Sequence, residues 1–158
     1  ISVDNFGEME AFLTDGLRSL LNTGYAQNMR EYTVRWPGHI QKWSQEKDHL
    51  SDSQLIEAWK FDETRYEFTW MEICFSYTDY EVTWEIVDTG KDGHSSMART
   101  TGLVTTACAV ELINQSNSES SQIECGVFAP EDLELDSIEK VIQSLKNEDV
   151  TILRTIIE

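Results

Sequence analysis

The spacing of hydrophobic residues along this chain predicts both strands, where apolar and polar residues alternate, and helices, where apolar residues recur every three or four positions. Apolar and polar residues alternate over residues 8–13, 28–36 and 80–87, which predicts three half-buried strands. The aromatic and β-branched run at residues 65–77 predicts another strand, joined by a short turn to the strand that follows it. A change in its alternation near residues 71–72 indicates a bulge. A closing strand is expected near the C-terminus, at residues 150–157.

In the N-terminal part of the chain, helix signals stand between the expected strands. Leu17, Leu20 and Leu21 follow an Asp-Gly break, so we expect a short helix there. The polar residues 41–49 are compatible with either a helix or a loop. The cluster Ser-Asp-Ser at residues 51–53 is typical of a helix N-cap, so a helix is expected to begin there.

Two further helices are expected in the C-terminal half. Residues 103–113 are apolar on nearly every side, which predicts a helix buried in the core and capped by Thr100 or Thr101. Pro and two acids at residues 130–132 are favoured in a first helical turn. The apolar stripe over residues 135–145 predicts that an amphipathic helix follows.

These elements predict an α+β fold. We expect a mostly antiparallel or mixed sheet of about five or six strands, with helices packed on it. Neither an internal repeat nor a linker is visible, so residues 1–158 are expected to form a single domain. No G-x-G-x-x-G sequence joins a strand to a helix, and therefore a doubly wound nucleotide-binding domain is not expected in this chain.

Charge and cysteine content narrow the possible partners. The formal net charge of -17 repels phosphate backbones and anionic lipid, so neither nucleic acid nor a membrane is expected as a partner. The acidic residues form a solvated surface or, alternatively, an acidic docking face. Cys74, Cys108 and Cys125 are widely spaced, which argues against disulfides and a zinc site and favours the reducing cytoplasm. No apolar run reaches the roughly 18 to 20 residues of a membrane span.

Three arginines stand beside Gly or Pro at the ends of expected elements, where binding sites are common. They are Arg18, Arg35 and Arg99. A guanidinium group binds a carboxylate through two parallel hydrogen bonds, so a substrate with several carboxylates would suit them. The alternative is that each arginine pairs with a nearby acidic side chain. His39 follows Pro-Gly and is either a site residue or a turn residue. Thr100 and Thr101 either cap a helix or lie where its N-H groups face an anion or a cofactor.

Taken in order, four segments resemble the C-terminal half of the saccharopine dehydrogenase family, which includes lysine 6-dehydrogenases. They read EAFLTDGLRSLL, NMREYTVRWPGH, SMARTTG and GVFAPED, at residues 10–21, 28–39, 96–102 and 126–132. The likeness weakens over residues 41–62. The resemblance implies a substrate-binding domain that forms a homodimer through its sheet. It also implies that NAD or NADP is bound mainly by an N-terminal Rossmann domain outside this chain, which itself begins without Met like a fragment.

The resemblance further implies an oxidoreductase of lysine metabolism. Hydride transfer would oxidise the amine carbon of a lysine-derived amino acid, such as saccharopine or lysine, to an imine. Arg18 and Arg35 match the family's substrate-pocket segments and would bind carboxylates, with Asp15 and His39 as polar neighbours. Arg99, Thr100 and Thr101 would lie near the cofactor. No metal is expected, no general base is identified, and the isolated chain is expected to bind no cofactor and not to catalyse the reaction. A stand-alone non-catalytic binding module and a purely structural dimerisation domain remain alternatives.

Overall fold

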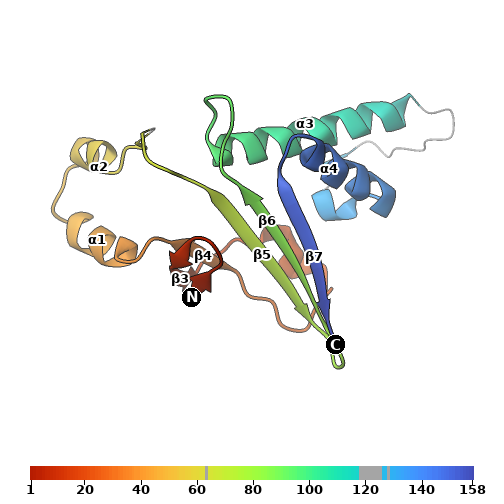
Figure 1. Cartoon of the computed structure of the whole chain (residues 1–158), viewed down its shortest axis with the longest axis horizontal. Coiled ribbons are helices and arrows are strands. Elements are labelled where there is room, and N and C mark those ends of the chain that lie inside the picture. Colours follow the sequence, from red (N-terminus) through yellow and green to blue (C-terminus); the bar gives the residue numbers. More distant parts are fainter. Residues whose placement is uncertain (63, 118–125, 128) are drawn as a thin grey trace. The chain divides into compact units, whose positions relative to one another are not determined.

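The computed structural model describes residues 1–62, 64–117, 126–127 and 129–158 (Figure 1). They form two compact units, Ile1–Phe61 and Asp62–Glu158. Helices and antiparallel strands occur together, which confirms the α+β class. The strands belong to three separate sheets instead of one, because loops and helices interrupt the pairing between successive hairpins. The expectation that both units belong to one domain stays a prediction.

The first unit contains two small antiparallel sheets. Strand β1 (Ser2–Val3) pairs with β2 (Gly7–Glu8), and β3 (Glu10–Leu13) pairs with β4 (Tyr32–Arg35). The strand expected at residues 8–13 is thus divided between β2 and β3, with the buried Met9 between them. After β3 the expected short helix is a 3-10 helix, η1 (Arg18–Asn22).

Two short helices complete the first unit. The polar segment at residues 41–49 lies mostly in helix α1 (His39–Glu46), which begins after Gly38 in a left-handed conformation (φ 88°). A carboxylate stabilises this beginning, since the Ile40 N-H donates to Glu10 Oε2 at 3.1 Å. Helix α2 (Asp52–Ala58) follows the expected cap at Ser51, whose N-H donates to the side chain of Gln54 at 3.0 Å.

The second unit is built on an antiparallel sheet in the order β5 (Thr69–Ser76), β6 (Glu81–Asp88) and β7 (Thr151–Ile157). The predicted bulge in β5 is wrong, because the register with β6 is unbroken from Thr69 to Ser76. Trp70 and Met71 are adjacent in the unbroken register and point to opposite faces, so the change of alternation reflects apolar residues on both faces of β5.

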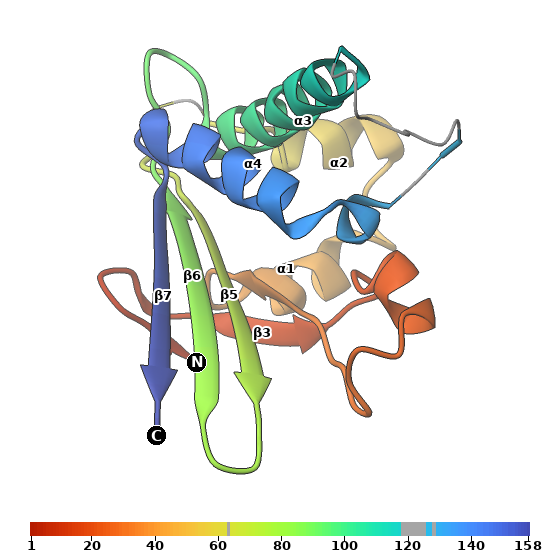
Figure 2. The ribbon, with the colours of Figure 1, turned by 90° about the vertical axis from the view of Figure 1, so that its right-hand side faces the viewer.

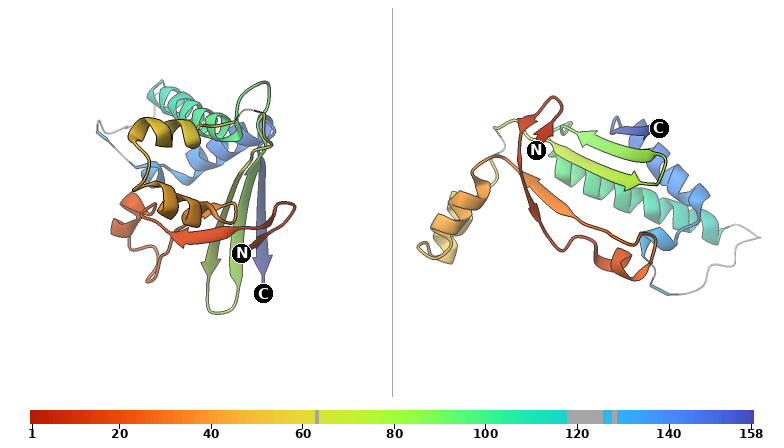
Figure 3. Two further views of the ribbon diagram at one scale, coloured as in Figure 1. Left: turned by 90° about the vertical axis from the view of Figure 1, so that its left-hand side faces the viewer. Right: turned by 90° about the horizontal axis from the view of Figure 1, so that it is seen from below.

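Helices α3 (Ser96–Ser116) and α4 (Leu135–Asn147) cover one end of one face of this sheet (Figures 2 and 3). The short 3-10 helix η2 (Pro130–Asp132) precedes α4, so the acidic turn and the amphipathic helix are separate elements. Leu145, Val150 and Ile152 form the buried core. Partly buried side chains pack around them: Trp84, Ile86, Leu103, Ala107, Val141 and Ile142.

The prediction that residues 103–113 form a fully buried helix is wrong. In α3 the buried residues are Ser96 and Glu111, whereas Val110 and Ile113 are exposed. A narrow sheet and one neighbouring helix cover only a stripe of α3, so its other apolar positions face outward.

A polar network connects α3 to α4. The buried Glu111 carboxylate accepts hydrogen bonds from Lys140 Nζ at 2.9 Å, Ser137 Oγ at 3.1 Å and Gln115 Nε2 at 3.4 Å. Gln115 also donates to Ser137. Each group in the network has a partner, so the network can hold the two helices in one register.

We expect Glu111 to make folding stability depend on acidity. The hydrogen bond from Lys140 holds the pKa of the Glu111 carboxyl below its ordinary value of 4.5. A lowered pKa in the folded state contributes stability above pH 4.5, and this contribution is lost as the pH falls through the folded-state pKa. Glu111→Gln should therefore be less stable than the wild type at neutral pH, and the difference should shrink in acid. Urea unfolding at several pH values measures it, with the exposed Glu139→Gln as control. A difference that is constant with pH would contradict the prediction.

Candidate functional site

The loop after β3 carries Asp15 and Arg18. Glu31 organises this loop, because its carboxylate accepts hydrogen bonds from the Thr14 hydroxyl and, at 3.2 Å, from the Gly16 N-H. Asp15 and Arg18 are both strongly exposed, and Asp15 Oδ2 lies 3.5 Å from Arg18 Nη1. Exposed pairs of this kind contribute little to stability, so a ligand carboxylate can replace Asp15 at low cost.

Arg35 and His39 lie where β4 ends and α1 begins. The exposed Arg35 side chain donates from Nη1 to the Val34 carbonyl at 2.8 Å. His39 belongs to an aromatic cluster, with its ring stacked 6.4 Å from Phe12 and edge-on at 4.9 Å from Trp59. The structure therefore leaves the guanidinium of Arg35 accessible and gives His39 packing contacts.

The substrate-binding residues expected from the sequence fall into two groups. Glu10 is opposite Arg35, and Leu13 is opposite Tyr32, in the antiparallel β3-β4 ribbon. Asp15 and Arg18 follow one end of this ribbon, whereas Arg35 and His39 follow the other. Four strand residues span about 10 Å. The structure pairs Asp15 with Arg18, gives Arg35 and His39 different neighbours, and places Arg18 and Arg35 at opposite ends of the ribbon.

Thr100 and Thr101 lie inside α3 instead of at its cap. Ser95 caps the helix by accepting the Ala98 N-H at 3.3 Å, so the prediction of a cap at Thr100 or Thr101 is wrong. The Thr100 hydroxyl donates back to the Ser96 carbonyl at 2.9 Å. The helix begins earlier than expected because residues 96–99 are compatible with helix and Ser95 is itself a good cap.

The N-terminus of α3 already holds a carboxylate of the protein. Glu67 Oε1 accepts the Ser96 N-H at 2.7 Å, and Glu67 Oε2 accepts the Ser96 hydroxyl at 2.5 Å. Thr69 Oγ1 lies 2.8 Å from the same hydroxyl, and Ser96 is fully buried. The positive end of the helix dipole is thus satisfied internally.

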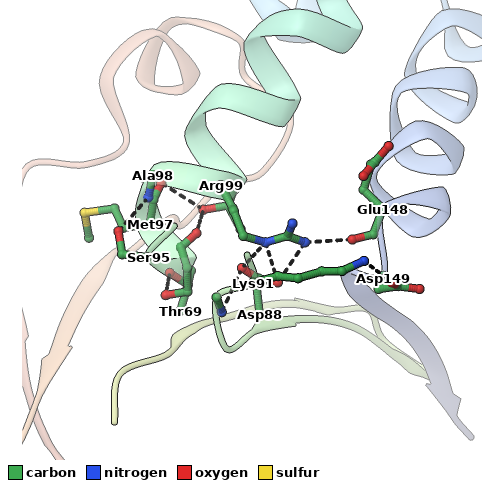
Figure 4. A network of polar contacts seen from close by, with 12 residues as sticks. Thr69, Asp88, Lys91, Ser95, Met97, Ala98, Arg99, Glu148 and Asp149 are labelled. Carbon is green, nitrogen blue, oxygen red and sulfur yellow. Dashed lines mark hydrogen bonds and ion pairs between the residues drawn. The ribbon is translucent and has the colours of Figure 1, made fainter. Parts of the chain in front are cut away.

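Arg99 is the centre of a polar network that joins β6, α3 and the turn after α4 (Figure 4). Its Nε lies 3.2 Å from Asp88 Oδ2, and its Nη2 donates to the Glu148 carbonyl at 2.7 Å. The side chains of Arg99 and Asp88 are 10% and 5% exposed. Such a buried ion pair needs additional hydrogen bonds, which the Glu148 carbonyl and the Gly90 N-H (3.3 Å from Asp88 Oδ2) provide.

A second ion pair lies beside this network. Lys91 Nζ is 2.8 Å from Asp149 Oδ2 (Figure 4), and this hydrogen bond raises the pKa of Lys91 and lowers that of Asp149. Asp149 has φ 64°, which is uncommon for a residue other than glycine. Between the pairs lies a cavity of about 260 Å³. Its walls are formed by Val87, Asp88, Thr89, Gly90, Lys91, Arg99, Asp149 and Thr151.

The charged side chains that line this cavity could bind a ligand through ion pairs and hydrogen bonds. Both of its cations contact carboxylates, so a ligand anion would have to displace Asp88 or Asp149. In the part of the chain that the structure describes, no group of three or more His, Cys, Asp or Glu side chains could hold a metal ion.

Sequence reasoning missed the partners of the predicted residues. Glu67 precedes β5 and Asp88 ends β6, which are positions where polar side chains are common. Nothing in the local sequence pattern connects either residue to α3. The separation of Asp88 from Arg99 spans a whole loop, and Glu148 is further still. Cys125 and Phe128 lie outside the described residues.

Comparisons with known proteins add no family assignment. Within the described residues, no helix has both the length and the apolar character needed to cross a membrane. Neither the family models, nor the curated proteins, nor the solved structures gave a match to this chain.

Proposed function

We propose that this chain is the substrate-binding and dimerisation part of an NAD(P)-dependent oxidoreductase of the saccharopine dehydrogenase type. Its substrate would be a lysine-derived amino acid oxidised at the amine carbon, in the cytoplasm. The observation that carries the proposal is Arg35, an exposed guanidinium at a strand end in a chain of net charge -17. Within the described residues, Arg35 makes one hydrogen bond, to the Val34 carbonyl. Its other guanidinium N-H groups are accessible to a carboxylate.

The spacing of the two arginines supports a long substrate. Arg35 ends β4 at one end of the β3-β4 ribbon, and Arg18 lies in the loop beyond the other end; the ribbon itself is about 10 Å long. Each guanidinium group can then bind a different carboxylate of one long ligand. Saccharopine carries carboxylates at both of its ends, so it suits these positions better than a small amino acid does.

The cofactor would be held mainly by another domain. The described residues do not fit a nucleotide phosphate, because Glu67 occupies the N-terminus of α3 and Asp88 pairs with Arg99. This chain would contribute the substrate pocket, and it would form a homodimer through its sheet. No catalytic step is assigned to its residues.

Replacing Arg35 should test the substrate pocket. A hydrogen bond to a charged group contributes about 1.5–3 kcal/mol, so Arg35→Ala should weaken saccharopine binding by roughly ten- to 150-fold. Isothermal titration of saccharopine into the wild-type chain and the variant measures the change.

Arg30→Ala is the matched control, because Arg30 is also an exposed arginine, lying just before β4. It should leave binding unchanged. If wild-type protein does not bind saccharopine, or if Arg35→Ala binds as the wild type does, the pocket assignment is wrong.

A stand-alone, non-catalytic binding or dimerisation module is the second candidate. The hydrogen bonds of Glu67 to Ser96 and the ion pair of Arg99 with Asp88 favour it, because a cofactor-facing surface would be expected to leave such groups available. The two candidates differ in the mass of the natural protein. A mass near the 18.2 kDa of this chain would favour the module, and one at least twice as large would favour the enzyme.

A further inference from the structure

The cavity beside Arg99 has the size of a small ligand. Its volume of about 260 Å³ is several times the roughly 30 Å³ that one water molecule takes in the liquid. It lies below the range of about 300–1,000 Å³ that is typical of pockets for drug-sized ligands. The space therefore suits a compact metabolite and is too small for a nucleotide.

Gly90 fixes one wall of this cavity. It has φ 76°, and a Cβ at this position would lie 2.7 Å from Glu67 Oε1 and 2.8 Å from the His94 carbonyl oxygen. Its N-H donates to Asp88 Oδ2 at 3.3 Å. Any other residue would be strained and crowded here, so glycine allows the turn after β6 to approach the start of α3 closely. This close packing holds the neighbouring Lys91 beside the cavity.

The two ion pairs that line the cavity differ in how easily they open (Figure 4). Arg99 and Asp88 are 10% and 5% exposed, so their separation would leave buried charges without partners. Lys91 and Asp149 are 45% and 75% exposed, and exposed pairs contribute little to stability. The Lys91 ammonium group also lies at the end of a flexible four-carbon stem. A ligand can therefore open the Lys91–Asp149 pair while the buried pair stays closed.

The charges around the cavity select the kind of ligand. Two cations and two carboxylates line it, so their charges cancel. An anion that separates Lys91 from Asp149 would pair with the ammonium group but leave the Asp149 carboxylate alone. A cation would pair with Asp149 but leave Lys91 alone. A zwitterion gives each of the two groups a new partner and keeps the local charge balanced.

Three uncharged side chains complete the lining. Among the described residues, the hydroxyl groups of Thr89 and Thr151 have no hydrogen-bond partner within the protein. A hydroxyl group can donate or accept, so each can bind either a carboxylate or an ammonium group. The half-buried Val87 adds apolar surface for a short aliphatic part of a ligand.

We propose that this cavity binds a small zwitterion of the free amino-acid type, whose carboxylate contacts Lys91 and whose ammonium group contacts Asp149. The exposed ion pair opens to admit the ligand, and its two members hold the opposite charges of the ligand. The proposal does not rest on the proposed function, because Arg18 and Arg35 belong to the first unit and do not line this cavity.

Ligands that carry one of the two charges test the selection. L-alanine has both charges, propionate lacks the ammonium group, and ethylammonium lacks the carboxylate. In an NMR titration of the isotope-labelled chain, L-alanine should shift the amide signals of Gly90, Lys91 and Asp149 until they saturate. Propionate and ethylammonium should each bind at least about tenfold more weakly. If L-alanine does not shift these signals, or if either of the other two binds as tightly, the proposal is wrong.

Replacing either member of the exposed pair should weaken binding of L-alanine at least about tenfold. Lys91→Met keeps most of the side-chain stem and removes the ammonium group. Asp149→Gly removes the carboxylate, and glycine readily adopts the left-handed conformation of this position (φ 64°), so the variant should fold. Lys146→Met is the matched control, because Lys146 is an exposed lysine at the end of α4 that does not line the cavity. It should bind L-alanine as the wild type does.

Arg35→Ala separates this cavity from the proposed substrate pocket. It should leave the binding of L-alanine unchanged, because Arg35 does not line the cavity. Loss of L-alanine binding in Arg35→Ala would overturn the assignment to the cavity. Wild-type affinity in both Lys91→Met and Asp149→Gly would overturn it as well.

Discussion

Arg99→Ala is expected to lower the free energy of unfolding by about 3–5 kcal/mol, because it leaves the Asp88 carboxylate buried without its cation. It also removes the hydrogen bond to the Glu148 carbonyl, which connects α3 to the end of α4. Urea unfolding followed by far-UV circular dichroism measures the loss as a lower midpoint.

Two further variants show whether the loss comes from the buried charge. Arg65→Ala removes an exposed arginine that pairs with Asp62, and should cost about 0–1 kcal/mol. The double variant Arg99→Met with Asp88→Asn removes both charges, so it should be more stable than Arg99→Ala. If Arg99→Ala costs no more than Arg65→Ala, the pair is not buried in solution.

Leu145→Ala is expected to cost about 2–5 kcal/mol, because it opens a cavity in the core of the second unit. Leu145 is 5% exposed and lies with Val150 and Ile152 between α4 and the sheet. Among the described residues of this unit few other side chains are buried, so little surrounding structure is available to fill the space. The midpoint of urea unfolding should fall while its slope stays constant.

The matched control lies on the same helix. Leu135 is 69% exposed, and Leu135→Ala makes the same chemical change at the other end of α4, so its effect should stay within about 0.5 kcal/mol. Equal losses at Leu135 and Leu145 would mean that the outer surface of α4 is covered in solution.

The sequence determined the elements whose signals are local. The alternation in β6 predicted a strand, although both of its faces are partly covered, and the stripe of α4 predicted an amphipathic helix. The cap at Ser51 likewise placed the start of α2. These predictions depend on neighbours within a turn or a strand, and therefore a single sequence is sufficient for them.

Local signals were insufficient where burial depends on the size of the neighbouring surface. The apolar residues of α3 predicted a helix buried on all sides, but the sheet beneath it has three strands and covers only part of it. The change of alternation that suggested a bulge in β5 came from apolar residues on both faces of an unbroken strand. Neither outcome is visible in periodicity, which describes the faces of an element and not what covers them.

By itself, the sequence determined the α+β class and the positions of the arginines at element ends. Only the tertiary structure decided what those arginines contact. It buried Arg99 against Asp88 and the Glu148 carbonyl, and it left Arg18 and Arg35 exposed at opposite ends of a ribbon. The physical reason is range: helix and strand signals act between near neighbours, whereas an ion pair joins side chains that only folding brings together.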